Sequence, residues 1–227
     1  MMDIYISTPG VQKLLANLNP SKAAGPDNLS PRVLKELSDV LADPLARLFR
    51  KSLASGQVPV GWKHASVTPV FKKGQKYLCS HYHSISLTCV ISKIMEHIIC
   101  SSPMNHAEHH NILYPLQHGF RPGRSCETQL LKMVNEVVNI MQLGLQTHIC
   151  ILDFSKAFDQ VGHRHLVPVL VEKLRMYGMD VEANTRIQNF LSNRSQSVLV
   201  EGACSSSIPV ISGARLCTGP LSLPLLH

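Results

Sequence analysis

The chain has 227 residues, of which 44% are hydrophobic and 16% are charged, and its formal net charge is +7 at pH 7. This composition is typical of a globular protein and argues against a disordered one, and no apolar run reaches the roughly 20 residues of a membrane-spanning helix. The positive charge favours a polyanionic partner such as nucleic acid.

The numbers and spacing of cysteine and histidine argue against a disulfide-rich or zinc-binding protein. The seven cysteines are odd in number and scattered, with no Cys-x-x-Cys pair. This pattern predicts reduced thiols and argues against a disulfide framework or a zinc ribbon. His106, His109 and His110 lie close together, but without an HExxH helix or a matched Cys/His set they indicate a solvated helix end. The stretch MMDIYISTPG lacks the pattern of a secretory signal, so we expect an intracellular protein, nuclear or cytoplasmic.

The first quarter of the chain predicts helices. A short helix is predicted at residues 11–18. Ser30 and Pro31 mark the next helix start, because a serine side chain caps free backbone amides and proline is tolerated at the first helical position. Apolar residues then recur at helical spacing. We expect Pro44 to end or kink that helix and Gly56 to close a second one.

The next part of the chain predicts a hairpin of two strands. Residues 65–71 (ASVTPVF) read as a strand, and residues 82–87 read as its partner. Lys72 and Lys73 fall in the turn just beyond the first strand. A hairpin with a basic loop can place cations over a triphosphate.

The second half of the chain alternates helices with strands. One apolar face predicts a helix at 127–141, with Gly144 just beyond its end. The apolar run 147–152 predicts a strand that projects the carboxylate of Asp153 from its end. Further elements are predicted as helices at 91–99 and 165–177 and a strand at 195–202. With no internal repeat and no low-complexity linker, the sequence predicts one mixed α/β unit.

Several segments together resemble a known family, in the same order along the chain. They are KAAGPDNLSP (22–31), GQVPVGWKHASVTPVFKKG (56–74), HYHSISLTCVISKIMEHII (81–99), QHGFRPGRSCETQLL (117–131) and DFSKAFD (153–159). They resemble the reverse transcriptase of non-LTR (LINE-type) retrotransposons, in the CR1 and jockey-like branch. The resemblance implies an α/β (α+β) fold that contains the fingers and the start of the palm of a right-hand polymerase. It divides the chain into a fingers-like region at 1–145 and a first part of the palm at 146–212.

The same resemblance implies RNA-directed DNA polymerisation, with an RNA template, a DNA primer, deoxynucleoside triphosphates and Mg²⁺. Such phosphoryl transfer uses two metal ions about 4 Å apart between carboxylates. The resemblance makes Asp153 the first catalytic, metal-binding aspartate and adds the backbone carbonyl of Phe154 as a metal ligand. It places Phe158 under the sugar, where a ring excludes a 2′-hydroxyl. A core position explains Phe158 equally well, and Asp159 reads as structural.

Other positions are assigned to nucleotide and template. Lys72 and Lys73 fall where relatives present cations to the triphosphate, although a solvated basic turn is the alternative. His83 stands where relatives carry the arginine that contacts the triphosphate, and imidazole is shorter and largely neutral at pH 7. Arg121 and Arg124, beside glycines, fit an approach to template phosphates.

The sequence also departs from the family. The 227 residues contain no YxDD segment, which in relatives carries the other two metal-binding aspartates. From Arg215 the stretch RLCTGPLSLPLLH replaces a family segment, and a one-base frameshift explains it, so we take 213–227 as aberrant and the palm as truncated. We therefore expect the chain alone to be inactive. The alternatives are a non-catalytic nucleic-acid-binding protein and the non-functional product of a decayed element.

Overall fold

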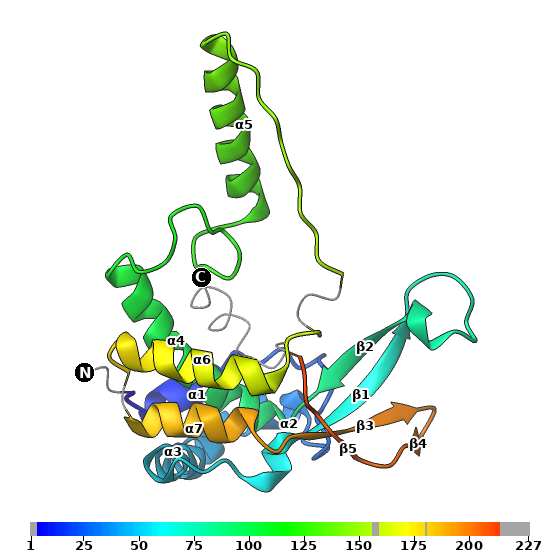
Figure 1. The fold of residues 1–227 in the computed structure, drawn as a ribbon. Coiled ribbons are helices and arrows are strands. Elements are labelled where there is room, and N and C mark those ends of the chain that lie inside the picture. The colour runs from blue at the N-terminus through cyan, green and yellow to red at the C-terminus, as the bar shows by residue number, and fades with distance from the viewer. Residues whose placement is uncertain (1–3, 156–158, 180, 214–227) are drawn as a thin grey trace.

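The computed structural model of the chain describes residues 4–155, 159–179 and 181–213. Phe158 and the segment from Arg215 lie outside these residues. The described part is a mixed α/β structure, as predicted, in which helices pack beside one sheet (Figure 1). The helices are α1 (Thr8–Ala16), α2 (Pro31–Glu36), α3 (Ser38–Ser55), α4 (Val90–His109), α5 (Cys126–Gln142), α6 (His163–Met176) and α7 (Val181–Leu191). The strands are β1 (His64–Phe71), β2 (Tyr82–Leu87), β3 (Ser195–Val200), β4 (Ala203–Cys204) and β5 (Ile208–Pro209), with short 3₁₀ turns at Val60–Lys63 and Cys79–His81.

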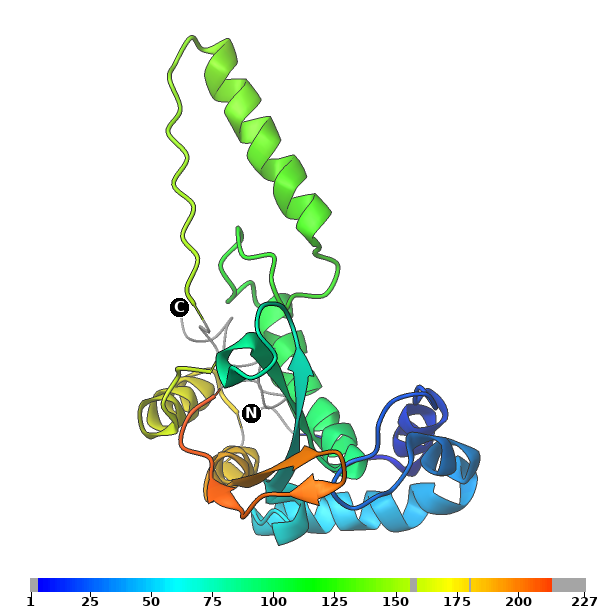
Figure 2. The same cartoon turned by 90° about the vertical axis from the view of Figure 1, so that its right-hand side faces the viewer.

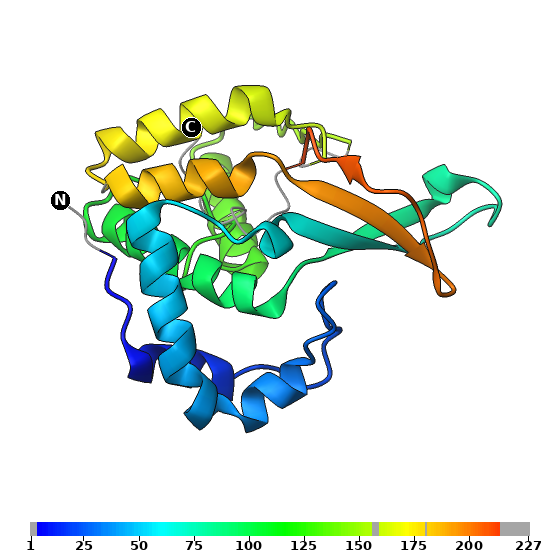
Figure 3. The same ribbon diagram turned by 90° about the horizontal axis from the view of Figure 1, so that it is seen from below.

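The sheet combines a local hairpin with a long-range pairing. β1 and β2 pair antiparallel, in a register that places Phe71 opposite Tyr82, and this confirms the predicted hairpin. β1 also pairs in parallel with β3, while β4 and β5 pair antiparallel with β3. The His64 side chain fixes the parallel register, because its Nδ1 lies 2.9 Å from Ser195 Oγ and its Nε2 lies 3.1 Å from Ser197 Oγ. Figure 3 shows the β1–β2 hairpin extending away from the helices.

The core lies among the helices at the base of the molecule. Apolar side chains of α1, α3, α4, α6 and α7 meet there, and Leu15, Phe49, Met95 and Leu170 are among those fully buried. The ring of Phe49 packs edge-on against Trp62, with centroids 6.0 Å apart. This packing joins α3 to the chain that enters β1.

A buried polar cluster crosses the same core. Arg186 of α7 is 1% exposed, and its Nε donates to Ser52 Oγ of α3 at 3.2 Å. Its Nη2 lies 3.2 Å from Met95 Sδ of α4, and the buried Glu96 accepts a hydrogen bond from Ser92 at 2.7 Å. Burial lowers the pKa of Arg186 to about 10, while the charge of Glu96 opposes that shift. Three helices are therefore tied together through one guanidinium group.

The helix starts confirm part of the prediction and correct another part. The Ser30 side chain accepts from the amide of Arg32 at 3.2 Å, and Gly56 ends α3 with φ of +64°. The helix break, however, falls at Leu37, and α3 continues through Pro44, so the prediction that Pro44 ends a helix is wrong. Pro44 lies inside α3 on its exposed side, where the ring meets solvent and the helix loses only one backbone hydrogen bond.

The α5 arm, residues 126–154, projects from this base (Figures 1 and 2). The predicted helix is confirmed: a capping box between Ser125 and Thr128 begins it, and Gly144 with φ of +71° follows its end. The chain then runs back toward the base in an extended conformation. The strand predicted at 147–152 is wrong, because the structure assigns no strand there. A strand needs a neighbour to satisfy its backbone, and no described strand pairs with this segment.

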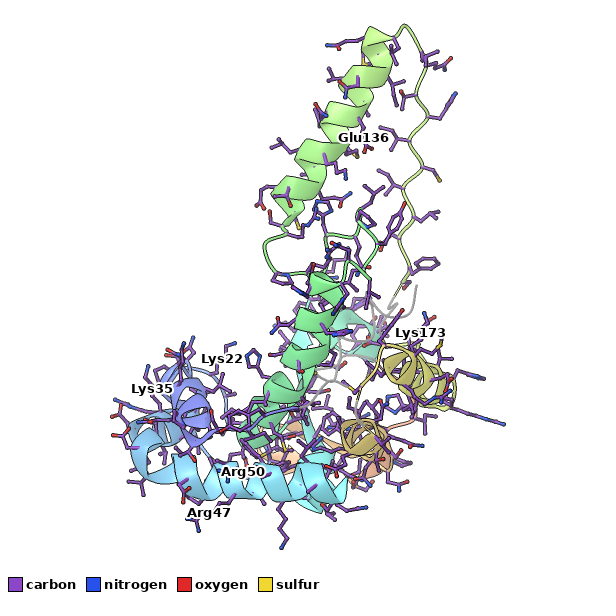
Figure 4. All side chains as sticks on the ribbon, turned by 90° about the vertical axis from the view of Figure 1, so that its left-hand side faces the viewer. Lys22, Lys35, Arg47, Arg50, Glu136 and Lys173 are labelled. Atoms are coloured by element: carbon purple, nitrogen blue, oxygen red, sulfur yellow. The ribbon has the colours of Figure 1, made fainter. Side chains whose placement is uncertain are left out.

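Several cations lie on the helical base, beside carboxylates such as Asp43. Figure 4 shows Lys22, Lys35, Arg47 and Arg50 around α2 and α3, whereas Glu136 lies out on α5. Arg47 pairs with Asp43 of the same helix at 2.7 Å, an exposed contact that adds little stability. Within the described ranges, none of the helices combines the length and hydropathy of a membrane span.

Candidate functional site

A tight clamp positions the start of α4 relative to the N-terminal helices. Gly25 approaches the backbone that links β2 to α4 so closely that a Cβ there would lie 2.6 Å from the Thr88 carbonyl oxygen. The thiol of Cys89 donates to Asp27 Oδ2 at 2.7 Å. Burial, together with this hydrogen bond, raises the pKa of Cys89 to about 11. The Gly-Pro-Asp loop is thus locked onto the β2–α4 junction, and only glycine fits its first position.

Beside that junction lies a polar cleft of about 250 Å³. Its walls come from β1, β2, β3, the first turn of α4 and the segments around residues 159 and 210–213. Six polar or charged side chains among its lining are Ser84, Ser86, Lys93, Asp159, Arg194 and Gln196. The cleft therefore brings together three parts of the chain that are far apart in the sequence. They are the SISLTC segment (84–89), Asp159 at the end of DFSKAFD, and the strand β3 (SQSVLV).

The charge balance of the cleft favours an anionic group, since two cations face one carboxylate. The Arg194 guanidinium is buried over the Phe190 ring, 4.3 Å from its centroid, and donates to the Phe190 carbonyl oxygen at 3.2 Å. Burial and then the charge of Arg194 lower the pKa of the neighbouring Lys63. Buried positive charge on this side of the sheet would stabilise phosphate oxygens in the cleft.

Sequence reasoning missed two of these cations and interpreted Asp159 as structural. Lys93 did carry a signal, because it stands in the first helical turn directly after SISLTC. Arg194 carried none, since its role depends on the parallel pairing of β3 with β1. The structure places Asp159 half-buried in the cleft lining.

The three nucleotide-binding residues predicted on the hairpin do not line this cleft. Lys72 and Lys73 are exposed at the tip beyond β1. His83 lies opposite Val70 in the β1–β2 register. Since neighbouring residues of a strand face opposite sides, His83 faces away from the side that Ser84 and Ser86 share. The roles assigned to Lys72, Lys73 and His83 stay predictions.

The predicted metal ligands lie elsewhere. Asp153 and Phe154 are exposed at the end of the extended segment that follows α5. In a polymerase, divalent ions need carboxylate oxygens that converge. Within residues 4–155, 159–179 and 181–213, no three His, Cys, Asp or Glu side chains are placed to hold a metal ion. The described residues do not by themselves fit the metal ions that the family implies, and the metal roles of Asp153 and Phe154 stay predictions.

Of the two arginines predicted to contact the template, Arg121 is held in an ion pair and Arg124 is exposed. Arg121 forms a bidentate ion pair with Glu108, with Nε to Oε1 at 2.8 Å and Nη2 to Oε2 at 2.6 Å. It also donates to the Tyr114 carbonyl oxygen at 2.9 Å, and its side chain is 8% exposed. This hydrogen-bonded pair lowers the pKa of Glu108. Arg121 therefore ties the 110–124 loop to α4, whereas Arg124 is exposed, with Nη1 3.5 Å from His118 Nε2.

The three clustered histidines lie at the C-terminal end of α4, which agrees with the predicted helix end. The rings of His106 and His110 are 4.3 Å apart, and those of His109 and His110 are 5.2 Å apart. Burial and the neighbouring imidazoles lower the pKa of His106.

Comparison with known proteins agrees with these features. Residues 70–199 match the family described as "Reverse transcriptase (RNA-dependent DNA polymerase)". The chain is 30% identical over 204 residues to the RNA-directed DNA polymerase from mobile element jockey of Drosophila melanogaster. The matched region covers 89% of this chain and 22% of that protein. It is 24% identical over 220 residues to the probable RNA-directed DNA polymerase from transposon X-element of Drosophila melanogaster, covering 96% of this chain and 23% of that protein.

A third relative has the same character. The putative 115 kDa protein in type-1 retrotransposable element R1DM of Drosophila melanogaster is 28% identical over 158 residues, covering 66% of this chain and 14% of that protein. The chain spans less than a quarter of the length of each of these relatives. With the matched family covering more than half of the chain, and the relatives all coming from mobile elements, this chain belongs to the reverse transcriptase (RNA-dependent DNA polymerase) family, in its non-LTR, LINE-type branch.

Proposed function

We propose that this chain forms the fingers and the start of the palm of an RNA-directed DNA polymerase from a non-LTR retrotransposon, and that it binds an RNA template, a DNA primer and a deoxynucleoside triphosphate. One observation carries the proposal. The SISLTC segment, Asp159 of DFSKAFD and β3 meet in one polar cleft with Lys93 and Arg194. Segments that match a polymerase family in sequence order thus converge in space on a surface suited to phosphate.

The reaction assigned to the family is phosphoryl transfer, in which the protein mainly positions the reactants and neutralises charge. In this proposal Lys72 and Lys73 approach the triphosphate from the hairpin tip. Lys93 and Arg194 set a positive potential in the polar cleft. Arg124, exposed at the end of the 110–124 loop, meets template phosphates, while Arg121 positions that loop through Glu108.

Divalent metal ions supply charge neutralisation and an activated primer hydroxyl in this family. We assign Asp153 as the first carboxylate for them. The 227 residues carry no YxDD segment, so we propose that binding and polymerisation separate here: the chain alone binds nucleic acid and does not extend a primer. The division at residues 145 and 146 between fingers-like and palm-like parts belongs to the same proposal.

The test combines binding with primer extension. A fluorescent RNA template annealed to a DNA primer is titrated with the full chain at several salt concentrations. We expect binding that weakens steeply with salt, since most of the affinity comes from phosphate contacts. Arg124→Gln should weaken it, whereas Lys51→Gln, at an exposed position on α3, should not. Absence of binding by the folded chain at low salt contradicts the proposal.

Primer extension with Mg²⁺ or Mn²⁺ tests the proposal that the chain alone does not extend a primer. We expect no incorporation by the chain alone. Reproducible incorporation that disappears in Asp153→Ala would show that other acidic groups complete the site. The second candidate function, a nucleic-acid-binding protein without chemistry, is favoured by the net charge of +7 and by His83 in place of the family arginine. Both candidates predict no incorporation by the chain alone, so the binding of a fluorescent deoxynucleoside triphosphate separates them: the first candidate expects it and the second does not.

A further inference from the structure

The loop between β1 and β2 carries cations together with exposed aromatic rings. Between Pro44 and Met95 the sequence contains eight Lys or Arg residues and no Asp or Glu. Three of the eight, Lys72, Lys73 and Lys76, lie in this loop. No carboxylate within that stretch of sequence neutralises them, so the hairpin tip presents concentrated positive charge.

The loop is held in one conformation by its own hydrogen bonds. The Lys72 amide donates to the His81 carbonyl oxygen at 3.0 Å, and the Gln75 amide donates to His81 Nδ1 at 2.7 Å. Gly74 has φ of +94°, and a Cβ there would lie 2.5 Å from the His81 ring. Glycine is therefore required at the turn, and the imidazole packs directly on it. The tip is preorganised, which lowers the conformational entropy lost on binding.

The aromatic rings of the loop are held by their polar ends. The Tyr77 hydroxyl donates to Gln75 Oε1 at 2.5 Å, yet 77% of the residue is exposed. The Tyr82 hydroxyl donates to the Lys76 carbonyl oxygen at 2.8 Å, and its ring packs edge-on against Phe71 with centroids 5.5 Å apart. The Lys76 ammonium lies 5.8 Å from the centroid of the Phe71 ring. Tyr77 is thus an anchored ring that is open to solvent.

We infer that the hairpin-tip surface, formed by Phe71, Lys76 and Tyr77, binds a single-stranded nucleic acid, with the Tyr77 ring stacked on a base and Lys76 on a flanking phosphate. Anchored aromatic rings beside cations are the combination that binds single strands without sequence preference. A duplex hides the faces of its bases, so stacking on Tyr77 favours an unpaired strand. The inference rests on the proposed function, in which that strand is the unpaired part of the template.

The test uses the full chain and two fluorescent RNA probes of one sequence, one single-stranded and one annealed to its complement. Anisotropy titrations compare the wild type with Tyr77→Ala, Tyr77→Phe and Tyr5→Ala. Loss of one stacked base typically weakens binding about tenfold, so we expect that loss for Tyr77→Ala on the single-stranded probe. Tyr77→Phe keeps the ring and should keep most of the affinity. Tyr5 is an exposed tyrosine outside the hairpin tip, and its replacement should change nothing.

Lysine variants supply an independent readout. Each phosphate contact contributes roughly 0.7 to the slope of log affinity against log salt for a single strand, so Lys76→Gln should reduce that slope by about this amount. The inference is overturned if Tyr77→Ala binds the single strand as tightly as the wild type, or if the duplex probe binds more tightly. Either result leaves the proposed function standing, provided that the wild type binds RNA. Loss of all RNA binding in the wild type contradicts both.

Discussion

The helical base and the α5 arm carry similar apolar stripes but treat them in opposite ways. In the base, Leu15, Phe49 and Leu170 are fully buried among five helices. On α5, Leu130, Leu131 and Val134 recur at helical spacing, and none of the residues of that helix is buried in this structure. The two regions separate what local sequence determines from what packing determines.

The comparison shows which elements survive without a partner. A helix satisfies its own backbone hydrogen bonds, and α5 also has a capping box. It therefore exists without burial. A strand depends on a neighbour for the same hydrogen bonds, and the apolar segment 147–152 is extended and unpaired in the described structure. Helical spacing predicted α5 and an apolar run predicted the strand, but only the helix, which satisfies its own backbone, formed.

The largest effect should come from the buried polar cluster of the base. Arg186→Ala removes the guanidinium that contacts Ser52 and Met95 and leaves the carboxylate of Glu96 buried nearby. Removing one partner of a buried charge pair costs about 3–5 kcal/mol. Urea denaturation should show this loss in the free energy of unfolding. A loss below 1 kcal/mol would mean that Arg186 is dispensable for joining α3, α4 and α7.

Identical leucine substitutions test the two regions directly. Leu170→Ala, at 0% exposure on α6, should destabilise the chain by about 2–5 kcal/mol. Leu131→Ala, at 73% exposure on α5, should change the free energy of unfolding by less than about 0.5 kcal/mol. Equal losses at both positions would contradict the exposed placement of α5 and show that its stripe is covered in solution.

A smaller effect is expected at the clamp between the Gly-Pro-Asp loop and the β2–α4 junction. Gly25→Ala places a Cβ 2.6 Å from the Thr88 carbonyl oxygen, and such overpacking costs about 1–3 kcal/mol. The control is Gly61→Ala, where an added Cβ meets nothing within 4 Å. Thermal unfolding of the two variants gives the difference. A stable Gly25→Ala protein would show that the clamp yields without cost.

The smallest effect concerns the Glu108–Arg121 pair, which ties the loop before α5 to the base. The pair lowers the pKa of Glu108 in the folded chain. Its stabilisation is therefore complete above the ordinary pKa of 4.5 and is lost as pH falls through the lower folded value. We expect about 1 kcal/mol. Proteolysis of the 110–124 loop should accelerate at low pH in the wild type, whereas Glu108→Gln should already show fast cleavage at pH 7.

Sequence predicted the elements whose causes are local. The bounds of β2 and the cap at Ser30 agree with the structure because strand alternation and capping need only neighbouring residues. α7 was not predicted, and the parallel pairing of β1 with β3 could not be, since it joins residues 131 apart. The same distance hides the cleft, because Arg194 reaches it only through that pairing. Arg121 had the composition of a phosphate ligand, and its ion pair with Glu108 depends on how the loop folds back on α4.

The parallel pairing of β1 with β3 has a consequence during synthesis of the chain. His64 and its partner Ser195 are 131 residues apart, so a ribosome that adds about 5–20 residues per second separates their emergence by roughly 7–26 s. Throughout this interval one edge of β1 has no strand beside it, and unpaired edges invite association with other chains. The β1–β2 hairpin can form within microseconds of its completion. Until β3 emerges, β2 therefore covers one edge of β1 while the other edge stays unpaired. Any factor that shields the nascent hairpin in those seconds should raise the yield of folded protein, whereas stabilising the finished fold should not.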